Sequence, residues 1–75
     1  MIRKEHRKYW MLVGAELDLR AIETKINGME HLLTEDAQSA YAISGKEKKL
    51  LKEQYTAMRD YACALKKRIK LLKGL

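Results

Sequence analysis

The sequence predicts an all-α protein, an antiparallel, coiled-coil-like two-helix hairpin that assembles into a helical-bundle homo-oligomer. Three observations predict this fold. The 75 residues include no proline and only four glycines. Two long segments carry apolar residues at heptad spacing, which places those residues on one face of a helix. A short segment between them breaks the pattern, and two long helices with a short connection pack antiparallel.

The first long helix is expected at about residues 3–33. Its apolar residues follow one another at alternating intervals of three and four: Leu12, Ala15, Leu19, Ile22, Ile26, Met29 and Leu33. Gly28 weakens this helix near its end, because glycine in a helix interior costs about 1 kcal/mol relative to alanine.

The connector is expected at residues 34–44. Thr34 followed by two acids is typical of a helix start. A short helix over residues 36–42 is therefore predicted, carrying Tyr41 and Ile43 back onto the hairpin.

The second long helix is expected at about residues 45–73. Ser44 and Glu47 fit a capping box at its start, and Gly74 fits a C-terminal stop. Its stripe has the same alternating intervals: Leu51, Gln54, Met58, Tyr61, Leu65, Arg68 and Leu72. Four further apolar residues widen this stripe: Leu50, Tyr55, Ala62 and Ile69.

The small size of the chain indicates partners. Residues 1–75 make one domain, and a chain this short buries too little surface to be stable alone without a disulfide, a metal or oligomerisation. Cys63 is the only cysteine and is interpreted as a small packing residue, so neither a disulfide nor a metal site is predicted. No cofactor is expected. The predicted partner is therefore a further copy of the same chain.

Apolar runs are short and the charge is basic. No run reaches the roughly 18 residues of a membrane span, so we expect a cytoplasmic protein without a membrane partner. The net charge of +6 favours anionic partners. Residues 1–8 hold four Lys/Arg and one acid, and residues 66–73 hold five and none. An antiparallel hairpin brings both clusters to one end, although lysine-rich helix ends also serve solubility alone.

Three groups of residues are candidates for ligand binding. Tyr9 and Trp10 lie one turn from Arg7, and aromatic faces stack on nucleobases while Arg holds phosphates. The alternative is that Trp10 caps the core. Lys67 and Arg68 belong to the second basic cluster, and Arg is suited to bidentate phosphate contacts.

Two polar residues interrupt the stripe of the second helix. An unpaired buried Arg is costly, so Arg68 lies at a rim, meets an acid of another helix or binds an anion. Gln54 is more simply a register-setting residue of an oligomer core, and reading polar ligand edges is its alternative role. Tyr61 lies midway and would line the same pocket. In a nucleotide complex we expect phosphate contacts from Arg68, Lys67 and Arg7.

The segment from Leu50 to Tyr61, with Leu65 and Arg68-Ile69, resembles the second half of a widespread family of small phage and prophage proteins. Residues 21–26, with Met29 and two following leucines, look like the first helix of that family. The resemblance covers roughly residues 16–72. It implies a small helical hairpin encoded by a phage or prophage. The chain departs from the family pattern at residue 21, where an acid is usual, and at residue 28, where Lys is usual.

No enzyme motif is present, so we expect a protein that is not an enzyme. The leading hypothesis is a phage accessory protein that oligomerises and sequesters a host nucleotide immune signal without turnover. One alternative is a structural or adaptor protein that binds a host or phage protein through its helices. Another is a basic nucleic-acid-binding protein, which the lack of helix-turn-helix spacing makes weaker.

Overall fold

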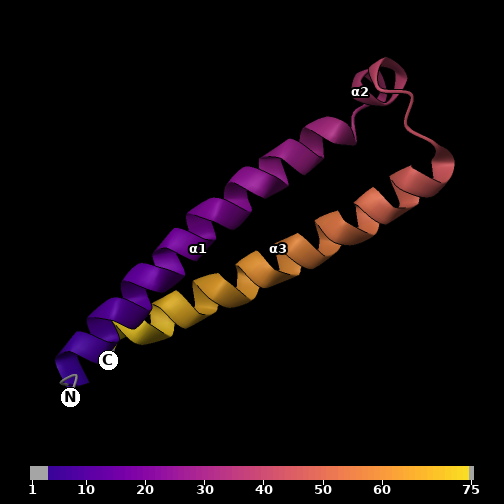
Figure 1. Ribbon diagram of the computed structural model, residues 1–75. Coiled ribbons are helices and arrows are strands. Elements are labelled where there is room, and N and C mark those ends of the chain that lie inside the picture. The colour runs from indigo at the N-terminus through magenta and orange to yellow at the C-terminus, as the bar shows by residue number, and fades with distance from the viewer. Residues whose placement is uncertain (1–3, 75) are drawn as a thin grey trace.

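The computed structural model describes residues 4–74, and the side chains of residues 7–74. Within that range the chain forms three helices: α1 at Lys4–Leu32, α2 at Glu35–Ala40 and α3 at Gly45–Gly74. The two long helices run side by side in opposite directions, and α2 lies across the turn (Figure 1). The all-α hairpin that the sequence predicts is thus confirmed.

The face of α1 that packs against α3 is the one predicted from the heptad spacing. Ala15 and Met29 are buried on it, and the other predicted positions are half-buried: Leu12, Leu19, Ile22, Ile26 and Leu33. Gly28 lies outside this face and is exposed. The regular alternation of three and four therefore defined this side of the hairpin correctly.

The caps in the connector explain where the helices begin. The Thr34 hydroxyl accepts a hydrogen bond from the Ala37 backbone N–H at 3.2 Å, so Thr34 is the N-cap of α2 as predicted. The Ser44 hydroxyl accepts the Glu47 backbone N–H at 3.1 Å, which caps α3. Each cap satisfies a backbone donor that the first helical turn leaves unpaired.

The expectation that Tyr41 packs back onto the hairpin is wrong. Its side chain is 63% exposed, whereas Ile43 is half-buried. The helix α2 ends at Ala40, one residue before Tyr41, so the tyrosine occupies the C-cap with its ring in solvent. Ala37 is the buried residue of α2 instead.

The face of α3 that packs against α1 differs from the predicted stripe. Its residues are separated by intervals of four and three, in that order: Leu51, Tyr55, Met58, Ala62, Leu65, Ile69 and Leu72. The predicted stripe and the observed face share the leucines and the methionine at residues 51, 58, 65 and 72. The other three residues of the predicted stripe are exposed: Gln54, Tyr61 and Arg68. The interpretation that Gln54 and Arg68 interrupt the buried stripe is therefore wrong within one hairpin.

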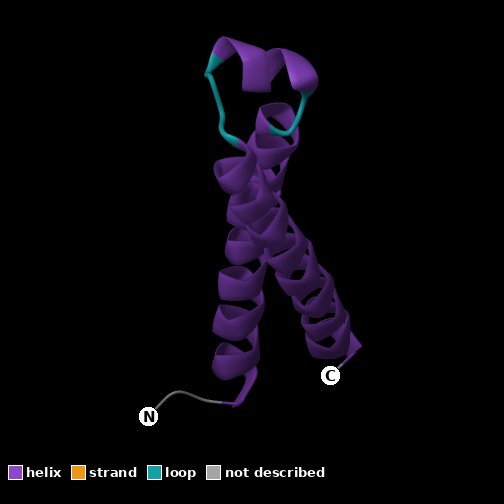
Figure 2. Cartoon of the chain, turned by 90° about the vertical axis from the view of Figure 1, so that its right-hand side faces the viewer, coloured by secondary structure: helices purple, strands orange, loops and turns teal. Residues whose placement is uncertain are grey.

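The best-packed part of the molecule lies near the two ends of the chain. Ala15 is buried there against three residues of α3, namely Leu65, Ile69 and Leu72. Leu12 and Leu19 complete this cluster from α1. The two long helices cross at a shallow angle (Figure 2), and the molecule measures 53 × 18 × 16 Å. No helix within residues 4–74 combines the length and apolar character needed to cross a membrane.

Candidate anion-binding groove

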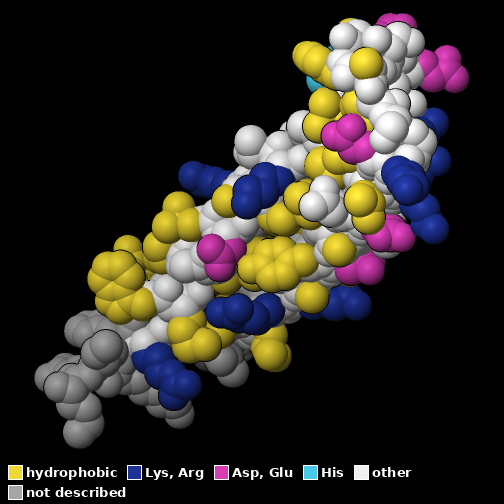
Figure 3. Space-filling view, turned by 45° about the vertical axis from the view of Figure 1, so that its right-hand side comes forward, with side chains coloured by type: hydrophobic (Ala, Val, Ile, Leu, Met, Phe, Trp, Pro, Cys, Tyr) yellow, Lys and Arg dark blue, Asp and Glu magenta, His cyan; other side chains and the backbone are white. Residues whose placement is uncertain are grey.

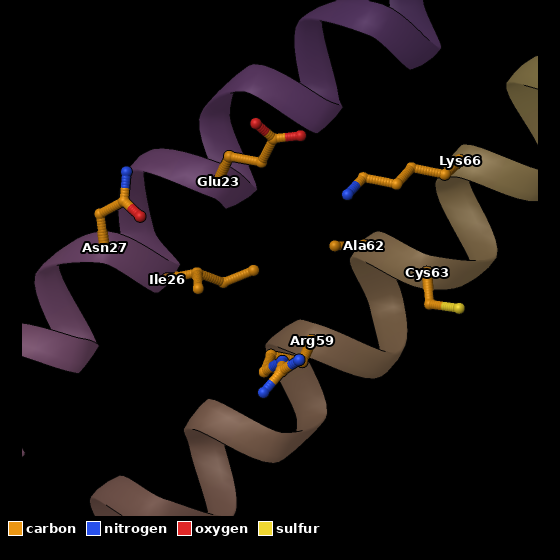
Figure 4. Close-up of a pocket in the computed structure, with 7 residues that line it drawn as sticks. All are labelled: Glu23, Ile26, Asn27, Arg59, Ala62, Cys63 and Lys66. Carbon is orange, nitrogen blue, oxygen red and sulfur yellow. The ribbon is translucent and has the colours of Figure 1, made fainter.

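One side of the hairpin has an open groove of about 460 Å³ between the long helices. Its lining is shown in Figure 4 and combines two cations, one acid, an amide, a thiol and two apolar side chains: Glu23, Ile26, Asn27, Arg59, Ala62, Cys63 and Lys66. The first three come from α1 and the last four from α3. Ile26 and the buried Ala62 form the apolar floor.

Charged residues reach this side because they repeat every seven positions on both helices. The α1 helix carries three acids at that interval, and α3 carries three cations at the same interval: Glu16, Glu23 and Glu30, and Arg59, Lys66 and Lys73. Lys73 Nζ lies 3.5 Å from Glu16 Oε1. The antiparallel arrangement also brings Glu23 and Lys66 to opposite sides of the same groove, and it brings Glu30 into contact with Tyr55, one turn before Arg59.

Tyr55 makes two contacts with these charged side chains, one with Glu30 and one with Arg59. The Tyr55 hydroxyl donates a hydrogen bond to Glu30 Oε1 at 2.9 Å. The Arg59 guanidinium lies 5.7 Å from the centre of the Tyr55 ring, within cation–π range. Tyr55 therefore engages the acid and holds the guanidinium at the mouth of the groove.

The two cations of the groove are not neutralised by close ion pairs. Among residues 7–74, no acid lies within 4.0 Å of the charged nitrogens of Arg59 or Lys66. Glu23 and Lys66 point toward one another across the groove without reaching that distance (Figure 4). With two cations and one acid, the lining carries a net charge of +1.

This arrangement is suited to binding a small anion. Arg59 and Lys66 are seven residues apart, which places their backbones about 10 Å apart along α3. Flexible side chains at that separation can contact two phosphates or the two ends of one pyrophosphate. Asn27 offers both a donor and an acceptor to polar edges, and the apolar floor can contact a base or sugar.

Three of the residues predicted to bind ligand lie together on a different surface. Gln54, Tyr61 and Arg68 form a line of exposed side chains on the flank of α3 away from the groove. Tyr61 is 49% exposed, so its ring is accessible. Lys67 lies beside them and lines a shallow depression with three neighbours near the end of α3: Lys70, Leu71 and Gly74.

The other predicted residues lie on the part of α1 that extends past α3. Leu12 still packs against the cluster that holds Leu65, Ile69 and Leu72, so α1 extends past the end of α3 only before that residue (Figure 1). Arg7 is exposed on this extension, whereas Arg68 is exposed on the flank of α3 away from the groove. The side chains of Arg3 and Lys4, which belong to the predicted basic pole, lie outside the described residues.

The aromatic pair on this extension is exposed. The Tyr9 and Trp10 rings are edge-to-face, with centroids 5.4 Å apart, and they are 59% and 63% exposed. The alternative in which Trp10 caps the core of the hairpin is wrong for the single chain. Cys63 is likewise exposed and lines the groove, contrary to its interpretation as a packing residue.

Arg59 and Asn27 were not among the residues predicted to bind ligand, and Lys66 was predicted only as part of the basic cluster at residues 66–73. The seven-residue interval between Arg59 and Lys66 was visible, and it places both on one side of α3. The spacing does not reveal where α1 lies relative to that side, because this depends on which face of α3 packs against α1.

These features define a class: a small all-α hairpin whose long helices frame a charged groove. Comparison with known families matches residues 18–71 to the family described as Sequestin, and this chain belongs to the Sequestin family. The matched span nearly coincides with residues 16–72, over which the sequence resembles the small phage proteins. No curated protein and no solved structure matches the chain significantly.

Proposed function

We propose that this chain is a phage-derived accessory protein that assembles with copies of itself and sequesters a small anionic ligand without turnover. The ligand class we propose is a host nucleotide immune signal, bound in the host cytoplasm. The family description, Sequestin, is compatible with a sequestering role. The net charge of +6 adds a general attraction for anions.

The observation that carries this proposal is the groove. Its volume of about 460 Å³ lies within the range of small-molecule sites, about 300–1,000 Å³. Arg59 and Lys66 are available to make charge-assisted hydrogen bonds to phosphate, which are stronger than neutral ones. We propose that these two residues hold the phosphates and that Asn27 contacts a polar edge of the ligand.

The test is a titration of purified protein with a panel of nucleotide signals, including cyclic dinucleotides and ADP-ribose derivatives. We expect saturable binding, and recovery of the ligand chemically unchanged by chromatography and mass spectrometry. Absence of binding across the panel would overturn the proposal. Binding of random duplex DNA that weakens steeply with salt would instead favour the nucleic-acid alternative.

The variant R59A/K66A tests the site. A hydrogen bond to a charged group contributes about 1.5–3 kcal/mol, so we expect the affinity to fall at least tenfold. The matched control is K46A/K49A, which removes the same charge from exposed positions at the other end of α3. Equal losses in both variants would show that only the net charge matters and would contradict the groove assignment.

The variant R68A tests the sequence-based prediction that Arg68 holds phosphate, in the same titration. If R68A abolishes binding while R59A/K66A retains it, the ligand binds on the flank of α3 that carries Gln54, Tyr61 and Arg68. That result would retain the sequestering function and reject the groove as its site.

A further inference from the structure

The flank of α3 away from the groove carries a second heptad stripe that nothing covers within the described residues. Leucine and alanine recur on it every seven residues, at Leu50, Ala57, Ala64 and Leu71, and all four are exposed. Leu50 is 60% exposed and Leu71 is 68% exposed. We call these four residues, with the interleaved line of Gln54, Tyr61 and Arg68, the α3 stripe.

Such a stripe is the pattern by which one helix packs against another. Hydrophobic side chains can be seen along the length of the hairpin between its charged side chains (Figure 3). The total accessible surface is 6299 Å², whereas a compact monomer of 8.8 kDa exposes about 4,800 Å². The excess of about 1,500 Å² on one chain is roughly twice the 800 Å² or so that each partner buries in a standard protein–protein interface.

The order of residues in the α3 stripe identifies the occupant. The sequence Leu, Ala, Ala, Leu at seven-residue intervals is the same in both directions. A second copy running antiparallel, related by a two-fold axis, would place Leu50 on Leu71 of the partner subunit and Ala57 on Ala64 of the partner subunit. Two-fold interfaces pair a surface with itself in this way. The alanines at the centre let the two helices approach closely.

The charges beside the α3 stripe fit the same register. When Leu50 lies opposite Leu71 of the partner subunit, Glu53 lies opposite Arg68 of the partner subunit. A parallel pairing in register would place Arg68 opposite Arg68 of the partner subunit, and like charges across an interface are unfavourable. Antiparallel pairing therefore places apolar residues opposite apolar residues and Glu53 opposite Arg68 of the partner subunit.

We propose that two copies of this chain pair antiparallel through the α3 stripe, with the two-fold axis between Asp60 and Tyr61. Glu53 forms an ion pair with Arg68 of the partner subunit, once on each side of the axis. The groove with Arg59 and Lys66 stays open in the pair, because it lies on the other side of α3. The pairing requires no ligand, so it stands or fails separately from the nucleotide proposal.

Charge reversal tests the ion pair. We expect wild-type protein without ligand at about 50 µM to have the mass of a dimer, or of a multiple of dimers, by sedimentation velocity. E53R and R68E should each dissociate at least tenfold more readily, while circular dichroism shows retained helix. The double variant E53R/R68E has the wild-type net charge and should recover the wild-type association. A monomeric wild type, or a double variant weaker than both single variants, would overturn the proposal.

Disulfide trapping tests the orientation. In a C63S background, a mixture of A57C and A64C should form a disulfide-linked heterodimer, because these positions are opposite each other. A57C alone should link poorly, since its two copies would lie about 10 Å apart along the axis, beyond disulfide reach. Efficient linking of A57C alone, or no more linking in the mixture than in the separate proteins, would reject the antiparallel register.

Discussion

At the scale of single residues, Ala42 adopts an unusual backbone conformation. Its φ of 51° lies in the left-handed region, which is costly for a residue with a Cβ. The Ile43 N–H bonds to the Gln38 carbonyl at 3.0 Å, and the Ala42 N–H bonds to the Ser39 carbonyl at 3.4 Å. These two bonds form a Schellman motif at the end of α2, whose left-handed position is usually glycine. The usual glycine signal is absent, so this turn could not be predicted from the sequence.

We expect Ala42→Gly to raise the free energy of unfolding by about 1 kcal/mol, because glycine adopts positive φ without strain. Thermal denaturation followed by circular dichroism measures the change. The control is Ala40→Gly, two residues earlier and still helical, which should lower stability by about the same amount. A loss of stability in both variants would show that Ala42 is not strained.

At the scale of the elements, the two helices differ in how well their packing faces could be predicted. On α1 the intervals of three and four define one narrow face. On α3 the predicted stripe joined the leucines and methionine at residues 51, 58, 65 and 72 with the flank that carries Gln54, Tyr61 and Arg68, although the opposite flank is the more apolar one. The structure uses the flank with Tyr55, Ala62 and Ile69. This choice exposes Gln54, Tyr61 and Arg68, and it is why the predicted site and the groove differ.

The register of the hairpin leads to a prediction for the Glu16–Lys73 pair. Exposed ion pairs contribute about 0.2–1 kcal/mol, so Glu16→Lys and Lys73→Glu should each lower stability by about 0.5 kcal/mol. The double variant E16K/K73E should recover that loss, and a double-mutant cycle from denaturant unfolding measures the coupling.

The control for that cycle is E16K/K66E, which has the same net charge as E16K/K73E. Lys66 is two helical turns from Lys73 and faces Glu23, so this exchange should not restore stability. Restoration by both double variants would mean that the helices are not held in one register.

At the scale of the whole molecule, the hairpin is too extended to be a typical monomer. Its radius of gyration is 16.9 Å, whereas a compact 75-residue domain has about 11 Å. Only seven apolar residues within the described range are buried, and four of them form the cluster near the chain ends. Burial of further apolar surface between copies would add the stability that so thin a core lacks.

The melting temperature should therefore depend on protein concentration. Association stabilises the folded state by mass action, so a hundredfold increase in concentration should raise the melting temperature by several degrees, on the order of 5 °C. Leu71→Lys, in the α3 stripe, should remove most of this dependence. Leu17→Lys is the matched control, because Leu17 is a similarly exposed leucine on α1. The same loss in both variants would place the interface elsewhere.

The amino-acid sequence alone was enough to establish the hairpin, the caps at Thr34 and Ser44, and the buried face of α1. These features depend on contacts between residues three or four apart, which any helix brings together. Packing of the two helices determined which flank of α3 is buried and that Glu23 lies across the groove from Lys66. Spacing along one helix defines directions around its own axis, but only the contact with a second helix determines which direction becomes the interior.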